Sequence, residues 1–278
     1  MYNTNVFNVT PYNTLFSPSG LAAQDNIVFN GYSLQSSTVS SRIAKHEVNP
    51  TRELLRNKIP RNDGMFIVGD FWREKTIRIE GIIRQTSAAL LDTEIDNFKK
   101  AMAVREGTLD IKNSSGTIRR YQATLVNVDV VNRENYNITF VRFSLSFVSV
   151  DPFGHDVNYS EELFSDKTDL VSNEFISNIG TVRALGIYTL TFSAASGITA
   201  VQVSNNTNTE LILSTVNISA GDVIVFDGEQ RIVTLNGTQI DYSGFFPSLD
   251  TGPNSFTITL TGTSATFTLS MKYLPPYL

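Results

Sequence analysis

The sequence predicts a mainly β protein of two domains with one long helix. A helical spacing of apolar residues is convincing only once, between residues 86 and 106. Elsewhere apolar and polar residues alternate in short stretches, as they do in strands with one buried face. Residues 1–158 hold 18 Lys or Arg and 16 Asp or Glu, whereas residues 159–278 hold 4 and 11. We therefore expect domains at 1–157 and 158–278, each long enough for its own core.

The chain begins with a polar segment, residues 1–25, that contains Pro11 and Pro18. We expect an arm here rather than a packed element. A first strand is predicted at 27–34, where apolar residues gather around Gly31.

A basic segment runs from residue 42 to residue 61. Its basic residues are Arg42, Lys45, Arg52, Arg56, Lys58 and Arg61. Two prolines, Pro50 and Pro60, predict a long excursion between strands. In one interpretation the last four basic residues form a contact arm for an acidic partner or nucleic acid. The other interpretation, a solvated loop, is favoured because no aromatic residues interleave for base stacking.

The segment 75–111 predicts a strand, a helix and a second strand, after a turn at 62–64 and a short strand at 65–68. The helix has one apolar stripe, formed by Leu91, Ile95, Phe98 and Met102. Thr86 or Ser87 is suited to cap it, because a short hydroxyl side chain accepts from the free amides of the first turn. Gly107 is suited to end it. A helix with a single apolar stripe is expected to lie on a sheet, which the flanking strands form.

A long antiparallel hairpin is predicted from 121–131 and 141–147. Val141, Phe143, Leu145 and Phe147 alternate with polar residues, and residues 132–135 suit the turn. Asp151-Pro152-Phe153-Gly154 is expected to close the first domain.

The second domain is predicted to be a β-sandwich, because short strands and turn residues recur at intervals of roughly ten. Residues 158–176 are expected to be a charged linker, partly helical or irregular. The predicted strands are 185–192, 200–204, 210–214, 223–227, 230–235, 255–261 and 265–273. Residues 274–278 are expected to form an extended tail.

The sequence offers little for catalysis, so we expect no catalytic, cofactor-binding or metal-binding residues, and no enzyme. There are no cysteines, and His46 and His155 have no metal-binding spacing. No Gly-rich phosphate loop or Gly-x-Ser-x-Gly elbow occurs. Asp222, Asp227 and Glu229 are close in sequence, but they lie in a turn–strand–turn pattern rather than a glycosidase arrangement.

Several phrases together resemble the distal tail protein family of long-tailed bacteriophages. In the first domain they are the unit 75–111 that ends in Arg105-Glu106-Gly107-Thr108-Leu109-Asp110-Ile111, then Tyr121-Gln122-Ala123 and Phe147-Val148-Ser149-Val150-Asp151-Pro152-Phe153-Gly154. In the second they are Asn178-Ile179-Gly180-Thr181, the run 218–227 and Leu249-Asp250-Thr251-Gly252-Pro253-Asn254. Their order and spacing cover roughly residues 25–278.

The resemblance implies a partly open N-terminal β-barrel carrying one helix and a C-terminal galectin-like sandwich. It implies a homo-hexameric ring that joins the tail tube protein to the tail-tip hub protein and leaves a central channel. No motif secures a single ring-contact residue. The implied location is the virion tail tip after synthesis in the host bacterial cytoplasm. The N-terminus lacks a signal peptide pattern, and neither membrane insertion nor sequence-specific nucleic acid binding is expected.

The alternative is a carbohydrate-binding protein that attaches to a host-surface glycan through the sandwich. Tyr242, Phe245 and Phe246, around Gly244, are candidate contacts for a sugar or a partner. We favour the other interpretation, in which these aromatic residues fill the sandwich or a domain interface. The only tryptophan, Trp72, lies in the first domain, which weighs against a sugar platform in the second.

Overall fold

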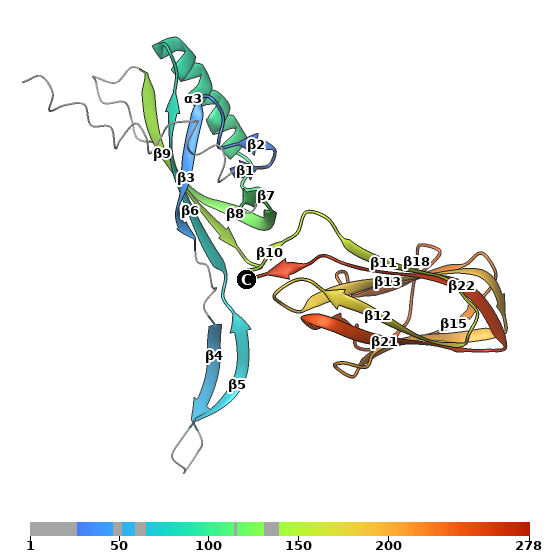
Figure 1. The fold of residues 1–278 in the computed structure, drawn as a ribbon. Helices are drawn as coiled ribbons and strands as arrows, with labels where there is room; N and C mark the ends of the chain where they lie inside the picture. The colour runs from blue at the N-terminus through green and yellow to red at the C-terminus, as the bar shows by residue number, and fades with distance from the viewer. Residues whose placement is uncertain (1–26, 47–51, 59–64, 114–115, 131–138) are drawn as a thin grey trace, which may run out of the picture. The chain divides into compact units, whose positions relative to one another are not determined.

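The computed structural model describes residues 27–46, 52–58, 65–113, 116–130 and 139–278, and it divides into two compact units. Unit 1 comprises residues up to Gly154 together with Leu278, and unit 2 spans His155–Tyr277 (Figure 1). The predicted boundary at 157/158 lies three residues later. The predicted N-terminal arm and the turns at 62–64 and 132–135 lie outside the described residues.

Unit 1 is built on one antiparallel sheet. Its strands follow the spatial order β2-β1-β7-β8-β9-β6-β3. Their bounds are β1 Ile27–Phe29, β2 Tyr32–Ser33, β3 Val39–His46, β6 Lys75–Arg84, β7 Glu106–Lys112, β8 Ile118–Val130 and β9 Phe140–Ser149. The pairing of β8 with β9 confirms the predicted hairpin. The sheet is not closed into a barrel.

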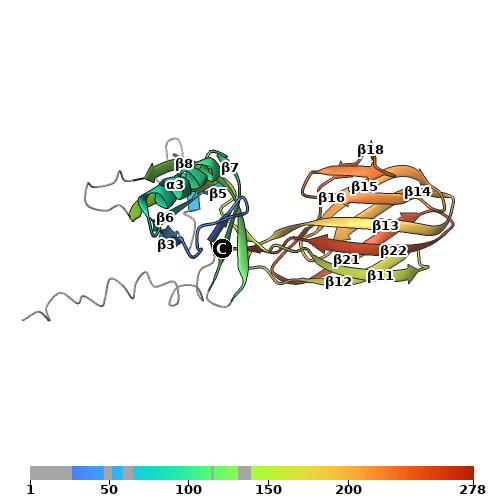
Figure 2. The same ribbon diagram turned by 90° about the horizontal axis from the view of Figure 1, so that it is seen from above.

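The helix α3 (Ala88–Met102) confirms the predicted stripe, because its buried residues are Leu91, Ile95, Phe98 and Met102. Ser87 is the cap, and its hydroxyl accepts from the amide of Leu90 at 3.4 Å. Phe98 packs on Phe143 of β9, with ring centroids 4.7 Å apart, so the stripe faces the sheet (Figure 2).

Glycine Gly81 lets the strands of this sheet approach closely beneath α3. A Cβ atom there would lie 2.4 Å from the Phe143 ring and 2.5 Å from the carbonyl oxygen of Ser40. The sheet therefore accommodates Phe143 only because this position of β6 has no side chain.

Two details of unit 1 differ from the predictions. The expected single strand at 27–34 is two short strands, because Asn30 and Gly31 both have positive φ and reverse the chain between β1 and β2. The helix ends at Met102, whereas Gly107 lies within β7. The Asn30 side chain occupies the space beside Gly107, where it accepts from the Thr108 amide at 3.0 Å.

The loop expected at 42–61 is a further difference from the predictions. Residues 42–46 belong to β3 and residues 52–58 form β4. β4 (Arg52–Lys58) pairs with β5 (Met65–Trp72) in a separate two-stranded sheet. We call this pair the ribbon. The charged residues Arg52 and Arg56 are exposed on β4, so they do not oppose strand formation.

Unit 2 is a sandwich of two antiparallel sheets, as predicted (Figure 1). One has the order β11-β22-β13-β16-β17-β18, with β20 beside β13, and the other β12-β21-β14-β15-β19. Bounds in the first are β11 Ser160–Lys167, β13 Ala184–Ser196, β16 Val223–Asp227, β17 Ile232–Leu235, β18 Thr238–Ile240, β20 Ser248–Leu249 and β22 Ser264–Tyr273. Those in the second are β12 Val171–Asn178, β14 Ile198–Asn205, β15 Glu210–Ile218, β19 Ser243–Gly244 and β21 Gly252–Thr261. Tyr188 of β13 meets Phe256 of β21, with ring centroids 5.3 Å apart, which joins the two sheets through the core.

The predicted linker at 158–176 is wrong. Strands β11 and β12 occupy most of it, one in each sheet, and neither is helical. β12 alternates strictly between exposed and buried residues, but its buried positions include Ser172, Glu174 and Asn178. This polar inward face conceals the strand from a search for apolar periodicity.

The extended tail predicted at 274–278 contains a short paired strand. β10 (Gly154–His155) pairs with β23 (Pro276–Tyr277), and Pro275 and Pro276 are buried. In the described part of the chain, no helix is long and apolar enough to cross a membrane.

Candidate functional site

The three carboxylates of unit 2 that are close in sequence serve separate local contacts. Asp222 accepts from the Ser219 amide at 2.7 Å and from Asn236 Nδ2 at 2.8 Å. These bonds hold the pKa of the Asp222 carboxyl below its ordinary value. Asp227 accepts from the Gln230 amide, and Glu229 accepts from the Tyr159 hydroxyl. Each carboxylate thus stabilises a turn or a neighbouring strand.

Among the described residues, no group of three or more His, Asp or Glu side chains is arranged to hold a metal ion. Tyr188, a fully buried tyrosine of the sandwich core, donates to the Pro247 carbonyl at 2.6 Å, and its burial raises its pKa well above 10. The hydrogen bond from Tyr188 holds the loop that contains Pro247.

The base of the ribbon is held by aromatic and charged contacts. Trp72 meets Phe153 edge to face, with centroids 6.1 Å apart, and the Arg52 guanidinium lies 5.2 Å from the centroid of the Trp72 ring. Arg73 donates to Glu53 at 2.6 Å, and this bond lowers the pKa of the Glu53 carboxyl. These contacts fix the ribbon where it joins β6.

Among the side chains that the structure describes, the ribbon exposes two large apolar ones. Leu55 and Phe71 have 49% and 45% of their surface exposed, although both are large and apolar. Neither β4 nor β5 has a further strand partner within the described parts of the chain. Each strand of the ribbon therefore has one unpaired edge, and two large apolar side chains are about half exposed. An isolated two-stranded sheet of this kind is only marginally stable in water.

The four basic residues of the predicted contact arm are placed unequally. Arg52 and Arg56 lie exposed on β4, and Arg52 contacts Trp72. Lys58 ends the same strand, and Arg61 lies outside the described residues. Their role in binding a partner stays a prediction.

The three aromatic residues of the predicted sugar or partner contact lie on one loop of unit 2, residues 241–247, but they differ in exposure. Tyr242 and Phe246 meet edge to face at 5.0 Å, and Phe246 packs against the sandwich core. The Tyr242 hydroxyl donates to the Arg231 carbonyl at 3.0 Å. Phe245 is 78% exposed. Only Phe245 therefore offers most of its ring to a ligand.

This loop is held in one shape by its backbone. Gly244 has φ +97° and pairs with Ile212 of β15, and a Cβ there would lie 2.4 Å from the Leu211 carbonyl oxygen. The Phe245 amide donates to that same carbonyl at 2.8 Å. The glycine therefore permits the close approach that displays Phe245 beside Leu211, which is itself exposed.

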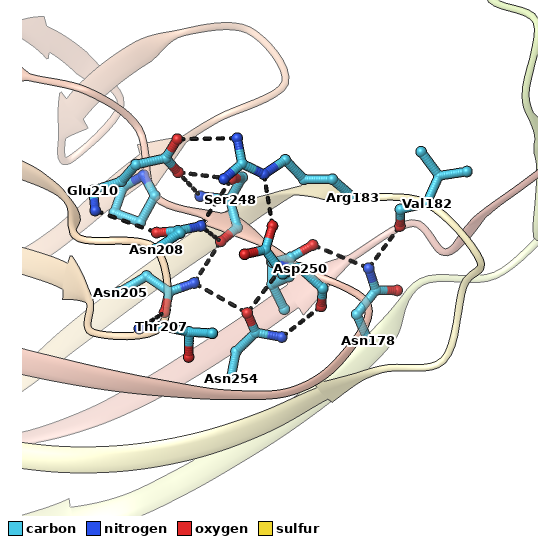
Figure 3. Close-up of polar contacts among 12 residues, drawn as sticks. Asn178, Val182, Arg183, Asn205, Thr207, Asn208, Glu210, Ser248, Asp250 and Asn254 are labelled. Carbon is cyan, nitrogen blue, oxygen red and sulfur yellow. Dashed lines mark hydrogen bonds and ion pairs between the residues drawn. The ribbon is translucent and has the colours of Figure 1, made fainter.

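The next residues are anchored by a buried polar network (Figure 3). The Ser248 carbonyl accepts from Asn205 at 2.6 Å and from Asn208 at 2.9 Å, while its amide donates to Glu210 at 2.9 Å. Arg183 pairs with Glu210 at 3.2 Å and with Asp250 at 2.8 Å. These residues fasten the loop to the ends of β14 and β15.

Two phrases of the resemblance meet in this network. Asn178 donates to the carbonyls of Val182 and Leu249 at 2.8 and 3.0 Å (Figure 3). Asn254 donates to the Asp250 carbonyl at 2.7 Å and accepts from the Asp250 amide at 2.9 Å. Because these buried amides are used for internal bonds, we interpret the network as support for the loop rather than as a binding pocket. Sequence reasoning located the two asparagines but not their convergence, since they lie 76 positions apart.

Comparison with known proteins agrees with this architecture. Residues 179–277 match the family described as the siphovirus-type tail component, C-terminal domain. The crystal structure of SPP1 Dit (gp 19.1) superposes with a TM-score of 0.66 at 12% identity, covering 91% of this chain and 99% of that one. The baseplate of phage P2 in its activated conformation with Ca gives a TM-score of 0.46 at 10% identity, covering 91% and 97%. No curated protein matches the chain.

The matched family is that of a tail component, and the likeness to SPP1 Dit shows a shared fold. The resemblance to the distal tail protein family of siphophage type is confirmed, with the fold of SPP1 Dit and the domain match as its two supports. The matched family and fold are those of structural tail proteins rather than of enzymes.

Proposed function

We propose that this chain is a ring-forming adaptor of a phage tail tip, without catalytic activity. Six copies form a closed homo-hexamer that joins the tail tube protein to the tail-tip hub protein and leaves a central channel. Unit 1 forms the ring, and unit 2 is a galectin-like sandwich on its outside. SPP1 Dit, whose fold the chain shares, is described as a paradigm of the hub adsorption apparatus in phages that infect Gram-positive hosts.

The observation that supports assembly is the ribbon. Two paired strands that expose Leu55 and Phe71 are only marginally stable by themselves in water. A neighbouring copy that covers them would remove apolar surface from water and give the strand edges partners. Repetition of this contact, in which one surface meets a different surface of the next copy, closes a ring when the rotation permits it.

Light scattering of the full chain over a concentration series tests the proposal. We expect the molar mass to rise to six copies, and negative-stain images to show rings with a central opening. Leu55→Asp combined with Phe71→Asp should keep the chain monomeric, because charge is placed where apolar surface is to be buried. A chain that is monomeric at every concentration would contradict the proposal.

A matched control separates ring contacts from general stickiness. Phe175 on β12 of unit 2 is 68% exposed and apolar, like the ribbon residues. Phe175→Asp should leave the hexamer intact. If it abolishes assembly as the ribbon variant does, unit 2 rather than unit 1 forms the ring.

A further inference from the structure

We propose that the outward face of the β12-β21-β14-β15-β19 sheet is a binding surface for a neutral polysaccharide. We call it the charge-free face. The inference goes beyond tail assembly and does not depend on ring formation, because it concerns unit 2 alone. It also moves the sugar site from the aromatic residues Tyr242, Phe245 and Phe246 alone onto the sheet beside Phe245.

Strand register places this face in rows across five strands. One row passes in order through Asn173, Thr257, Ser204, Leu211 and Phe245. The next passes through Val171, Thr259, Gln202, Leu213 and Ser243. With strands about 4.8 Å apart, the face is roughly 19 Å wide, enough for several sugar rings.

No outward-facing strand position of this face carries an ionisable side chain. The two glutamates of these strands, Glu174 and Glu210, belong to the opposite side, where Lys167 and Arg183 pair with them. Serine, threonine, asparagine and glutamine fill the middle of the rows. The other sheet differs, because one of its rows contains ionisable residues. That row passes through Glu161, Lys272, Ile187 and Asp227.

The absence of charge favours a neutral ligand. A ligand that covers a charged side chain without pairing it must leave a desolvated ion, and this face has none to desolvate. Hydroxyl and amide groups both donate and accept hydrogen bonds, which suits the hydroxyls of a saccharide. The domain has 11 acidic and 4 basic residues from 159 onward, so its overall charge disfavours an anionic polymer.

The face also has apolar ends that suit the C–H surface of a sugar ring. Phe245 and Leu211 lie at one side, and Val171 and Phe175 on the edge strand β12 lie at the other. Gly244 and the polar network hold Phe245 in place, so little conformational entropy is lost when a ligand packs on it. In the centre, Thr257 donates to Asn173 at 2.6 Å and accepts from Asn206 at 2.8 Å, which orders the polar groups before a ligand arrives.

Affinity electrophoresis of the full chain tests this inference. Native gels would contain dextran or galactomannan as neutral polysaccharides, or polygalacturonate as an anionic one. We expect retardation by at least one neutral polymer and none by polygalacturonate. Phe245→Ala should weaken binding between about two- and tenfold. Thr259→Lys, which places a charge in the middle of the face, should weaken it by at least about tenfold.

Thr268→Lys is the matched control. Thr268 is a partly exposed threonine on the outward side of β22, in the other sheet. This variant should bind as the original chain does. The inference is overturned if neither neutral polymer retards the chain, if polygalacturonate retards it equally, or if Thr268→Lys weakens binding as much as Thr259→Lys. Ring formation would be unaffected by any of these outcomes.

Discussion

The two units bury their cores in different ways. Unit 2 packs two sheets face to face, so each covers the other. Unit 1 has one principal sheet and one described helix, and its core lies where α3 covers the sheet. Strand β8 extends beyond that cover, and Val126 and Val128 are exposed there. The ribbon adds two further strands that no described element covers.

This difference indicates which unit depends on a partner. The sandwich packs its core between two paired sheets and uses polar networks to fix its loops, although single apolar side chains such as Phe175 and Phe245 are exposed on it. A single sheet with one helix leaves edges and apolar side chains outside, which partners are suited to cover. The proposed ring is thus an expected consequence of how unit 1 is built, whereas the surface of unit 2 is left for other contacts.

The largest expected effect is on the helix–sheet core of unit 1. Phe98→Ala removes a fully buried ring that packs on Phe143 and should lower the free energy of unfolding of unit 1 by about 3–5 kcal/mol. Urea denaturation followed by Trp72 fluorescence measures it, because this single tryptophan lies in unit 1. Leu90→Ala, at a 51% exposed position of the same helix, should change stability by less than about 0.5 kcal/mol. Equal effects would contradict the stated role of the stripe.

Disrupting the polar network should cost less stability than removing a core aromatic residue. The loss should affect unit 2 alone. Asn254→Ala leaves the Asp250 backbone amide without its acceptor and removes one of the two acceptors of the buried Asn205 side-chain amide, at a cost of roughly 1–3 kcal/mol. Calorimetry should show a lower transition temperature for unit 2 and an unchanged one for unit 1. Asn206→Ala, at an exposed asparagine next to Asn205, is the control. A shift in both transitions would mean that the units are not independent.

The next effect concerns the cap of α3, for which the sequence offers two candidates, Thr86 and Ser87. Ser87→Ala should destabilise unit 1 by about 0.5 kcal/mol, the lower end of the usual range, because its bond to Leu90 is long at 3.4 Å. Thr86→Ala should have no measurable effect. Circular dichroism during urea titration measures both. The reverse order would move the cap to Thr86.

The smallest expected effect is the loss of stability on removal of the turn contact of Asp222. This loss depends on pH. The folded pKa lies below the ordinary 3.8, so the ionised carboxylate stabilises the fold above that value. The stabilisation is lost as pH falls through the folded pKa, when the carboxyl becomes protonated. Asp222→Ala should therefore lower the melting temperature of unit 2 slightly at pH 7, and the difference should vanish near pH 2. A difference that grows in acid would contradict the cause given for the shift.

The sequence predicted those elements whose periodicity expresses burial directly. Leu91, Ile95, Phe98 and Met102 repeat at helical spacing because they face one sheet, and the 141–147 alternation shows one buried face in the same way. β12 was missed because its inward side chains are polar and are satisfied by distant partners, such as Lys167 for Glu174. β4 was missed because a ribbon needs no buried face.

The candidate surfaces were harder to predict than the fold. Phe245 and its neighbours were found because aromatic residues around a glycine are noticeable, but their different exposures depend on backbone pairing with β15. The charge-free face combines residues from five strands, and only strand register brings Asn173 and Leu211 into one row. Single-strand patterns contain no information on that order.

Hydrogen–deuterium exchange of the ribbon tests whether unit 1 is completed by a neighbouring copy. The amides of β4 and β5 would be followed in dilute monomer and in the assembled form, with β13 and β22 of the sandwich as an internal reference. We expect rapid exchange of the ribbon in the monomer and strong protection on assembly, with the reference strands unchanged. Ribbon amides that are equally protected in both states, or that exchange as fast in the assembly as in the monomer, would contradict it.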